Sequence, residues 1–331
     1  MGTPAYIGMG SNLGDRRAIL DAAVESLGRL PGSRVSAVSR YYETAPVGGP
    51  PDQGPFLNAA AALETTLEPL TLLAGLQEIE TKAGRVRVVR WGERTLDLDL
   101  LLFGGTVLDT PTLSVPHPWM AVRRFVLAPL CEIAPDRVDP VTGTSVQSLL
   151  ENLERRPSLV CLGGCWRDGV AAWRSAFERV VRALNAHVVS LGDPFLSRDT
   201  ARGRLISLRN LAQQLEWWKS DGDRWIVADF SPADFAEDAE RRRIARLSRR
   251  RAVRVRSLLR PTIVVQRAPT SANSIRRLGI REDGVPTLLL ASDSPDELSE
   301  RMIDACNAAR SPATVADASR VPPVLRYDAA E

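Results

Sequence analysis

Apolar positions in the first 155 residues follow two spacings, one typical of strands and one typical of helices. Four short apolar or alternating segments predict strands: Ala5–Met9, Val35–Tyr42, Phe56–Glu64 and Thr95–Phe103. Helical spacing covers Arg16–Leu30, Pro69–Lys82 and, later, Val146–Leu153. Before that last helix, the order strand–helix–strand–strand–helix–strand predicts an α+β fold, a ferredoxin-like α/β sandwich.

A second pattern begins after the polar stretch Glu154–Ser158. Strands are predicted at Ser158–Leu162, His187–Leu191, Trp225–Asp229, Thr262–Gln266 and Thr287–Ala291, with helices between them, the first at Val170–Leu184. This alternation favours an α/β domain with a mainly parallel sheet. We therefore expect domains over residues 1–154 and 158–310. The last residues, 311–331, are rich in Ala, Pro and Ser and predict a flexible tail.

Composition is that of a globular protein, and we expect a cytoplasmic location. Of 331 residues, 44% are hydrophobic and 25% charged, which is enough to bury a core in each of two domains. The net charge of +3 rests almost entirely on arginine and does not by itself indicate a nucleic-acid partner. Four cysteines form no CxxC pair, and we expect no signal peptide, membrane span or membrane partner. Composition does not indicate an oligomeric state.

Two aspartates interrupt the apolar strand at Thr95–Phe103. Side chains on a strand alternate between faces, so Asp97 and Asp99 share one face while leucines occupy the other. Two neighbouring carboxylates repel each other and need a cation nearby. Four arginines precede them within ten residues: Arg85, Arg87, Arg90 and Arg94. These could form a surface ion-pair ladder, or they could join Mg²⁺ in binding a polyphosphate, which the excess of arginine favours.

Several ordered blocks resemble one enzyme family. The run R-W-G-E-R-T-L-D-L-D-L-L at Arg90–Leu101 resembles the signature of 6-hydroxymethyl-7,8-dihydropterin pyrophosphokinase. The other blocks are AYIGMGSNLGD, YYETAPVG, FLNAA and VPHPWMAVRRFVLAPLCEIAPD, in the family's order. The resemblance covers about residues 3–153. It implies transfer of diphosphate from ATP, the co-substrate, to the pterin hydroxymethyl group in folate biosynthesis, with release of AMP.

The resemblance also implies site residues. Asp97 and Asp99 correspond to ligands of two Mg²⁺ ions, and with Arg85 and Arg94 they form the implied catalytic set. The implied ATP-binding residues are Gln77, Glu80, Arg87, Arg90, Arg94, His117 and Arg123. The implied pterin-binding residues are Thr44, Pro46, Val47, Phe56, Asn58, Trp91 and Phe125. Taken singly, Asn58 would be a turn former, the two phenylalanines core residues and His117 a loop histidine. Their common register with one family favours the functional interpretation.

The second half contains an incomplete phosphate-binding loop. Gly164 and Gly169 have Walker A spacing between a predicted strand and helix, but Val170 and Ala171 stand where that loop has Lys and Ser or Thr. Without these groups, nothing pairs the β- and γ-phosphates or holds the metal. Segments Gly192–Asp199, Trp225–Asp238 and Arg260–Asp283 are similar to blocks of deoxynucleoside kinases, over about residues 158–310. The resemblance implies a degenerate, non-catalytic P-loop domain.

Three alternatives stay open for the chain. It could be a bifunctional fusion whose second domain is an active or nucleotide-binding kinase, with Arg276, Arg277 and Arg281 in a lid. It could also be a nucleotide sensor without catalysis. The arginine-rich segment Arg241–Arg260 admits a nucleic-acid interface. Its interleaved Ile, Leu and Val residues favour an amphipathic helix with a solvated face instead, so we expect no nucleic-acid partner.

Overall fold

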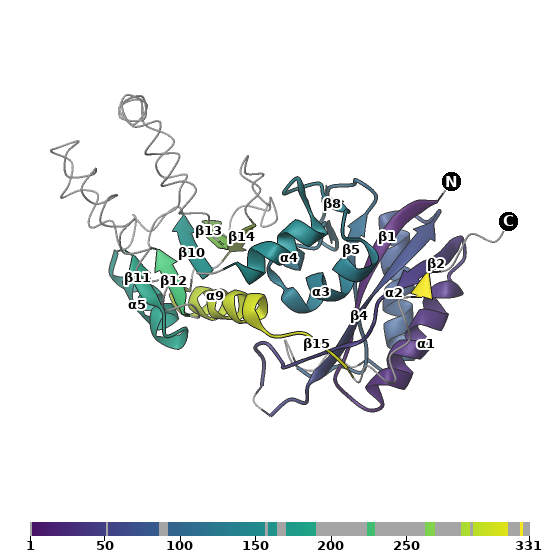
Figure 1. The fold of residues 1–331 in the computed structure, drawn as a ribbon, viewed down its shortest axis with the longest axis horizontal. Helices are drawn as coiled ribbons and strands as arrows, with labels where there is room; N and C mark the ends of the chain where they lie inside the picture. Colours follow the sequence, from purple (N-terminus) through teal and green to yellow (C-terminus); the bar gives the residue numbers. More distant parts are fainter. Residues whose placement is uncertain are drawn as a thin grey trace, which may run out of the picture. The chain divides into compact units, whose positions relative to one another are not determined.

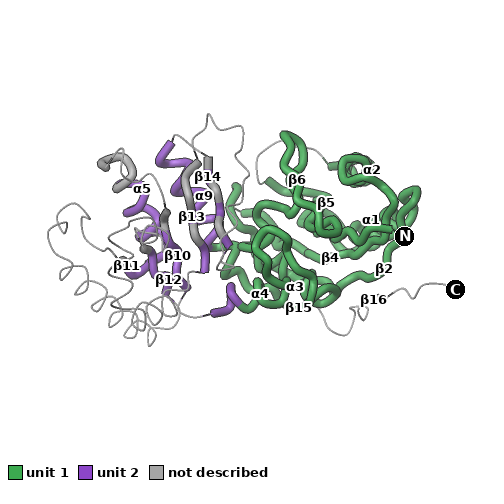
Figure 2. The backbone as a smooth tube through the Cα atoms, turned by 90° about the horizontal axis from the view of Figure 1, so that it is seen from above, with its two compact units in different colours: residues 1–151, 307–331 green, residues 152–306 purple. Residues whose placement is uncertain are grey.

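The computed structural model divides into two compact units (Figure 2). The structure describes residues 2–50, 52–85, 92–155, 158–163, 170–189, 224–228, 262–268, 286–291, 294–316 and 325–326. Unit 1 comprises Met1–Glu151 and Asn307–Glu331, and unit 2 comprises Asn152–Cys306. The end of the chain therefore belongs to the same unit as its beginning. Among the described helices, none is long and apolar enough to span a membrane.

Unit 1 is built around an antiparallel sheet. Its strands are β1 (Thr3–Ser11), β2 (Ser33–Val38), β3 (Tyr42–Thr44), β4 (Phe56–Thr65), β5 (Asp97–Phe103), β15 (Thr314–Val315) and β16 (Leu325–Arg326). The order is β15-β3-β4-β1-β5, with β2 also paired with β4 and β16 with β2. Within this sheet, β5-β1-β4-β3 is the strand order of a ferredoxin-like fold. The predicted α+β class with an antiparallel sheet is confirmed for unit 1.

Helices cover both faces of this sheet. The helices are α1 (Arg16–Gly28), α2 (Pro69–Lys82), α3 (Arg124–Ile133) and α4 (Val146–Glu154), with a 3₁₀ turn at Met120–Val122. Figure 1 shows α1 and α2 on one face of the sheet and α3 on the other. Two short hairpins, β6 (Leu108–Asp109) with β7 (Ser114–Val115) and β8 (Val138–Asp139) with β9 (Thr144–Ser145), complete the described elements of unit 1.

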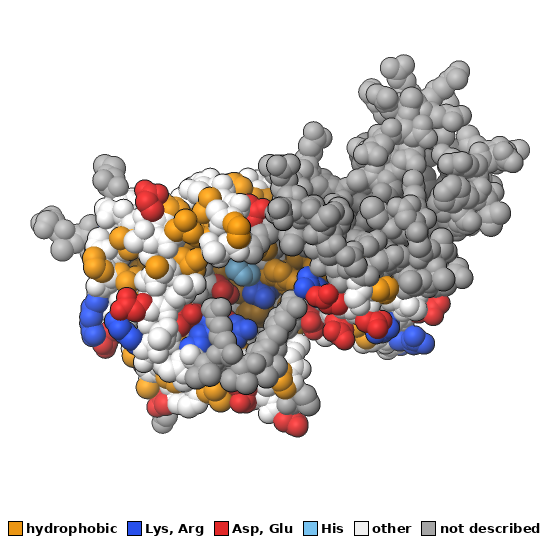
Figure 3. All heavy atoms as spheres, turned by 180° about the vertical axis from the view of Figure 1, so that it is seen from behind, with side chains coloured by type: hydrophobic (Ala, Val, Ile, Leu, Met, Phe, Trp, Pro, Cys, Tyr) orange, Lys and Arg blue, Asp and Glu red, His pale blue; other side chains and the backbone are white. Residues whose placement is uncertain are grey.

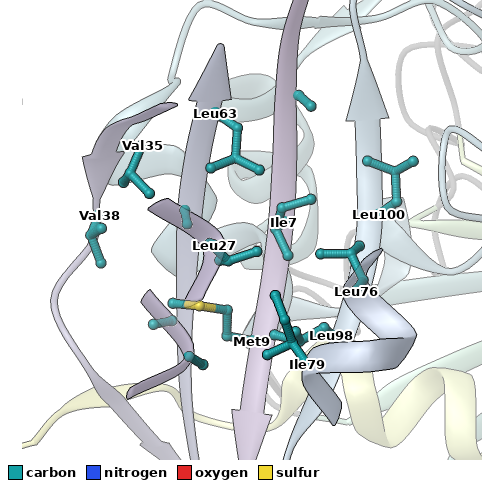
Figure 4. Close-up of a cluster of buried hydrophobic side chains, with 14 of the residues drawn as sticks. Ile7, Met9, Leu27, Val35, Val38, Leu63, Leu76, Ile79, Leu98 and Leu100 are labelled. Atoms are coloured by element: carbon teal, nitrogen blue, oxygen red, sulfur yellow. The ribbon is translucent and has the colours of Figure 1, made fainter. Parts of the chain in front are cut away.

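The main core lies between the sheet and helices α1 and α2. Alternate strand residues, among them Ile7 and Leu100, point toward Leu27 of α1 and Leu76 of α2 (Figure 4). Each of these four side chains is buried. Burying a large aliphatic side chain contributes about 2 kcal/mol to folding. This face therefore fixes the register of the strands. The alternate residues point to the opposite face, part of which α3 covers.

The edge strand is interrupted where the sequence predicts one strand, Val35–Tyr42. The structure ends β2 at Val38 and begins β3 at Tyr42. At the break, Ser39 keeps two hydrogen bonds to Ala60 of β4. Its N–H donates to the Ala60 carbonyl at 2.9 Å, and its hydroxyl accepts from the Ala60 N–H at 2.9 Å. Ser39 thus satisfies the backbone of β4 with a side chain, a substitution that residue alternation does not reveal.

Helix α3 is the main element that the apolar pattern does not predict. Pro129 lies inside it, and proline ordinarily breaks a helix interior. Its anchor to the edge strand is Glu132, which accepts from the Tyr42 hydroxyl at 2.6 Å and from the Arg40 backbone N–H at 2.9 Å. The Arg40 guanidinium also pairs with Glu132, with Nε at 2.6 Å. Burial and the Glu132 carboxylate raise the pKa of Tyr42, so its hydroxyl remains a donor.

Unit 2 contains a parallel five-stranded sheet. Its strands are β10 (Ser158–Gly163), β11 (His187–Val189), β12 (Trp225–Ala228), β13 (Ile263–Ala268) and β14 (Thr287–Ala291), in the order β11-β12-β10-β13-β14. The described helices are α5 (Val170–Ala183) and α9 (Pro295–Arg310). All five strands lie where the sequence predicts them, and every pair is parallel. Segments 164–169, 192–199 and 241–260 lie outside the described residues.

The predicted flexible tail, 311–331, contains two strands. β15 pairs antiparallel with β3, and β16 pairs antiparallel with β2. Ala316 also packs against the main core of unit 1. The Ala-, Pro- and Ser-rich composition that predicts a tail does not exclude edge pairing, because that pairing uses backbone groups that every non-proline residue carries.

Glu132 should make the stability of unit 1 depend on acid pH. Burial opposes ionisation, but hydrogen bonds from Arg40 and Tyr42 lower the pKa of Glu132 below its ordinary 4.5. A depressed carboxyl pKa stabilises the folded state above the unfolded pKa, and this contribution is lost as pH falls through the folded pKa. Glu132→Gln should lower the free energy of unfolding at neutral pH by about 2 kcal/mol.

Urea unfolding of both proteins between about pH 7 and about pH 3 measures this difference, which should shrink on the acid side. The control is Glu25→Gln, since Glu25 of α1 forms an exposed ion pair with Arg29, just beyond the end of that helix. That variant should unfold like wild type. A Glu132→Gln deficit that stays constant down to about pH 3 would contradict the assignment.

Candidate active site

One row of residues crosses four strands of unit 1 on the face opposite the main core. Asp97 of β5 is paired with Gly10 of β1, Gly10 with Asn58 of β4, and Asn58 with Tyr42 of β3. Residues directly opposite each other in a sheet share a face. Asp99 is paired with Gly8 and lies on the same face, as strand alternation predicts. The Asp97 carboxylate and the Asn58 amide therefore lie about 10 Å apart, two strand spacings, with Gly10 of β1 between them.

Asp97 is held between two arginines. Its Oδ1 lies 2.7 Å from Nη2 of Arg85, and its Oδ2 lies 2.5 Å from Nη1 of Arg94. Both guanidinium groups are largely shielded from solvent. Ion pairs in such shielded positions are stronger than exposed ones. Two of the four arginines noted in the sequence, Arg85 and Arg94, thus form ion pairs with the same aspartate, Asp97.

Glu80 of α2 holds the Arg85 guanidinium in place by an ion pair with the nitrogen that does not contact Asp97. Its buried carboxylate accepts the Leu98 backbone N–H at 2.8 Å and also bonds Arg85 Nη1. Leu98 lies between the two aspartates on β5, so Glu80 ties helix α2, Arg85 and the acidic strand together. Arg85 therefore bridges a buried carboxylate on one side and Asp97 on the other.

Asp99 is the more accessible of the two aspartates. Its side chain is 37% exposed, against 19% for Asp97, and among the described residues two nitrogen-bearing groups approach it at 3.9 Å: the Arg123 guanidinium through Nη1 and the His117 imidazole through Nε2. At that separation neither contact is a hydrogen bond. Asp99 thus keeps its carboxylate oxygens available to a ligand.

His117 is a neutral imidazole with a defined tautomer. Burial, helped by the positive charge of Arg123, lowers the pKa of His117 from 6.5 to about 3. Its Nδ1 accepts the Trp119 backbone N–H at 3.2 Å, so the ring proton is on Nε2. That Nε2–H faces Asp99 and can donate to an oxygen ligand beside it. Arg123 lies next to the aromatic rings of Trp119 and Phe125, 5.4 and 5.6 Å from their centroids.

At the other end of the row, Asn58 is oriented by Thr44. The Asn58 side-chain N–H donates to the Thr44 hydroxyl at 2.9 Å, and both residues are buried. Gly10 leaves room for this amide, since a Cβ there would lie 3.3 Å from Asn58 Oδ1 and 3.8 Å from the Phe56 ring. Phe56 is paired with Thr44. Thus Thr44, Phe56 and Asn58 form one polar and aromatic surface.

The remaining predicted residues are less directly placed. Gln77 is exposed on α2, and Pro46 and Val47 follow β3, partly buried. Arg87, Arg90 and Trp91 lie outside the described residues. Arg276, Arg277 and Arg281 of the second half do so too. The structure therefore brings together Asp97, Asp99 and four of the predicted cationic or imidazole groups, namely Arg85, Arg94, His117 and Arg123.

Asn12 is a supporting residue that the sequence interpretation misses. Its Oδ1 accepts the Arg94 backbone N–H at 2.7 Å, and its own backbone N–H donates to the Arg94 carbonyl at 3.1 Å. This clamp fixes the backbone of the arginine that pairs with Asp97. An asparagine in the turn GSNLGD is the available signal, because such residues often hydrogen-bond backbone groups.

The chemistry of the donors suits a hard cation. Among the described residues there is no group of three or more His, Cys, Asp or Glu side chains that could enclose a metal. Two carboxylates on one face nevertheless fit Mg²⁺, which usually takes one or two protein carboxylates and completes its shell with phosphates and water. Figure 3 shows a hollow on this unit where basic and acidic side chains gather beside a histidine. The residues present fit a magnesium–polyphosphate ligand.

Comparisons with known proteins agree with this site. The profile of the 7,8-dihydro-6-hydroxymethylpterin-pyrophosphokinase (HPPK) family matches residues 6–135. A Pseudomonas aeruginosa protein named 2-amino-4-hydroxy-6-hydroxymethyldihydropteridine pyrophosphokinase is 50% identical over 157 residues, which cover 46% of this chain and 96% of that protein. A Bacillus subtilis protein of the same name is 51% identical over 133 residues, covering 40% of this chain and 79% of that protein.

A solved structure of Plasmodium falciparum HPPK-DHPS with pterin and p-hydroxybenzoate covers 92% of this chain and 84% of its own. Its identity is 13% and its TM-score 0.37, too low to support a conclusion. The curated relatives are matched over most of their own length, whereas more than half of this chain lies beyond the alignments. On the strength of these relatives, the chain belongs to the 7,8-dihydro-6-hydroxymethylpterin-pyrophosphokinase family.

Proposed function

We propose that unit 1 transfers diphosphate from ATP to 6-hydroxymethyl-7,8-dihydropterin, the reaction for which its relatives are named, and that the row from Asp97 to Asn58 is where the two substrates meet. The observation that supports this most is the register itself. It gives one face of one sheet a carboxylate–arginine end suited to ATP and an amide–aromatic end suited to a heterocycle. A sensor without catalysis would not need both a carboxylate–arginine end and an amide–aromatic end on one surface.

The ATP end would use Arg85, Arg94, Arg123 and His117. Guanidinium groups bind phosphate oxygens through paired hydrogen bonds, and the neutral imidazole donates from Nε2. Asp97 and Asp99 would hold two Mg²⁺ ions. When bound, magnesium neutralises phosphate charge and lowers the pKa of a bound hydroxyl. The predicted contacts of Gln77, Arg87 and Arg90 with ATP belong to the same proposal.

The pterin end would use Asn58, whose amide both donates and accepts hydrogen bonds, as a heterocycle edge requires. Its bond to Thr44 fixes which atoms of the amide face the ligand. Phe56 and Phe125 would stack on the ring, with Thr44, Pro46, Val47 and Trp91 along its edges. The buried position of Asn58 makes the loss of a hydrogen bond there costly, which favours a ligand with the matching edge.

The chemical step follows from this arrangement. The hydroxymethyl oxygen attacks the β-phosphorus of ATP and loses its proton, while the bond from the β-phosphorus to the oxygen on the α-phosphorus breaks and AMP leaves. Arg85 and Arg94 would stabilise the negative charge that develops on the phosphates, and their hydrogen bonds to Glu80 and Asn12 would hold them in position beforehand. Positioning and electrostatic stabilisation of this kind are the main contributions to phosphoryl transfer.

Unit 2 is proposed to be a degenerate deoxynucleoside-kinase-like P-loop domain, with boundaries near 158 and 310 and without catalysis. Its sheet places β10 in the centre, and the helix α5 that follows begins at Val170. Ligands of parallel sheets bind where the connections from a central strand diverge. At that position Val170 and Ala171 provide neither an ammonium group nor a hydroxyl group.

Removing either acidic group should abolish turnover. Asp97→Asn and Asp99→Asn should each lower kcat for AMP release at least about 100-fold, since each removes charge that binds the magnesium–phosphate ligand. Quantifying AMP from ATP, Mg²⁺ and the pterin measures this. Asp109→Asn is the control, because Asp109 is exposed on β6 and bonds Ser114. Retained turnover in both site variants, with the fold intact, would reject the assignment.

Gly10→Ala should weaken pterin binding specifically. The alanine Cβ would lie 3.3 Å from Asn58 Oδ1, so the amide would have to shift by a few tenths of an ångström, which would disturb its hydrogen bond to Thr44. We expect KM for the pterin to rise about 10-fold, equivalent to about 1.4 kcal/mol, with KM for ATP little changed. Gly105→Ala is the matched control, because nothing lies within 4 Å of its added Cβ. A rise in KM for ATP alone would place the pterin elsewhere.

The second unit should not phosphorylate deoxynucleosides. The full chain, incubated with labelled ATP and each deoxynucleoside, should form no deoxynucleoside monophosphate, since the lysine and hydroxyl that phosphoryl transfer uses are missing from residues 170 and 171. Chromatographic separation of labelled nucleotides measures this. A monophosphate product that persists in Asp97→Asn would instead support the bifunctional alternative.

A further inference from the structure

The C-terminal strap, residues Ser311–Ala316, lies along the edge strand of unit 1. Thr314 is paired with Glu43 and Val315 with Tyr42, both antiparallel. The Ala316 N–H continues the ladder and donates to the Tyr41 carbonyl at 2.9 Å. The Thr314 hydroxyl lies 3.4 Å from the Glu43 carbonyl. The strap thus covers the outer edge of β3.

Strand β3 needs such support more than the other strands of the sheet that carry the row. It has only three residues, and the break at Ser39 separates it from β2. A short edge strand leaves its outward N–H and C=O groups open to water and is easily displaced. The strap occupies that edge, and Ala316 packs against the main core, which holds both segments in place.

Strand β3 also carries the residue that orients the pterin amide. Thr44 is its last residue and accepts from the side chain of Asn58. On the same strand, Tyr42 faces Asn58 directly and bonds Glu132 of α3. Any shift of β3 therefore moves the partner that fixes the Asn58 amide. β5, with both aspartates, lies at the opposite edge of the sheet, separated from β3 by β4 and β1.

We propose that the strap is a positioning element for the pterin end of the site: by pairing with β3 it holds Thr44, and through Thr44 the Asn58 amide, in the orientation that binds the substrate. This inference rests on the proposed function. The family profile ends at residue 135, so the strap lies beyond the matched region and is contributed by the chain that follows unit 2. Pterin affinity in this protein then depends on residues some 270 positions downstream of β3.

A backbone change tests this most directly. Ala316→Pro removes the N–H that donates to Tyr41, while Ala316→Ser keeps it and is the matched control. We expect Ala316→Pro to raise KM for the pterin about 5- to 30-fold, with kcat and KM for ATP within about twofold of wild type. Deletion of 311–331 should have the same effect or a larger one. Ala316→Ser should match wild type.

Hydrogen exchange provides a second readout that does not depend on turnover. The amides of Tyr42–Thr44 should exchange faster in Ala316→Pro, while those of β5 keep their wild-type protection. A synthetic peptide of residues 311–326, added to the truncated chain, should lower KM for the pterin again, since strand addition can occur between separate chains. This comparison also applies if Ala316→Pro does not fold.

The outcomes separate the two claims. If wild type neither binds the pterin nor releases AMP, the proposed function is wrong. If wild type is active and Ala316→Pro exchanges faster at β3 yet keeps its KM for the pterin, the strap is only structural and the inference is overturned. Equal loss of pterin and ATP affinity would also overturn it, because it would indicate general destabilisation.

Discussion

Strand register is the constraint on which the site of unit 1 depends. The same alternation that turns Ile7, Leu98 and Leu100 toward helices α1 and α2 turns Asp97, Asp99 and Asn58 to the opposite face. A slip of β5 by one residue would move both carboxylates into the apolar core. Burial of an unpaired charge in such surroundings is strongly unfavourable, so the slipped register would not be populated. Packing of the hydrophobic core therefore keeps Asp97, Asp99 and Asn58 together on the opposite face of the sheet.

The two aspartates share a face but have different surroundings. Asp97 bonds two arginines, one of which is fixed by the buried Glu80 and the other by Asn12. Within the described part of the chain, Asp99 has the Arg123 guanidinium and the neutral His117 imidazole at 3.9 Å, and its side chain is more exposed. Binding of a magnesium–phosphate ligand would thus compete with existing ion pairs at Asp97, whereas at Asp99 it would add contacts. The arginines that neutralise Asp97 are then already in place for the phosphates.

The order of units along the chain gives the C-terminus a structural role. Because Asn307–Glu331 belongs to unit 1, unit 2 is inserted between two parts of one domain. The strap pairs with β3 by backbone hydrogen bonds, the interaction that depends least on side-chain identity. An inserted unit that returns the chain to the sheet edge can thereby influence a substrate site through a strand, without contributing a side chain to it.

The sequence by itself determined the order of β1, α1, β4, α2, β5 and α4 in unit 1, its α+β class and the shared face of Asp97 and Asp99, because local periodicity and a short family signature encode them. It predicted neither helix α3 nor the break between β2 and β3. The five strands of unit 2 also follow from local apolar runs. Other features required the tertiary structure. The Asn12 clamp, the anchoring of Arg85 by Glu80 and the role of Gly10 beside Asn58 are contacts between separate elements. The pairing of the C-terminal strap with β3 could not be predicted from the sequence either, because it uses backbone hydrogen bonds that almost any residue can form.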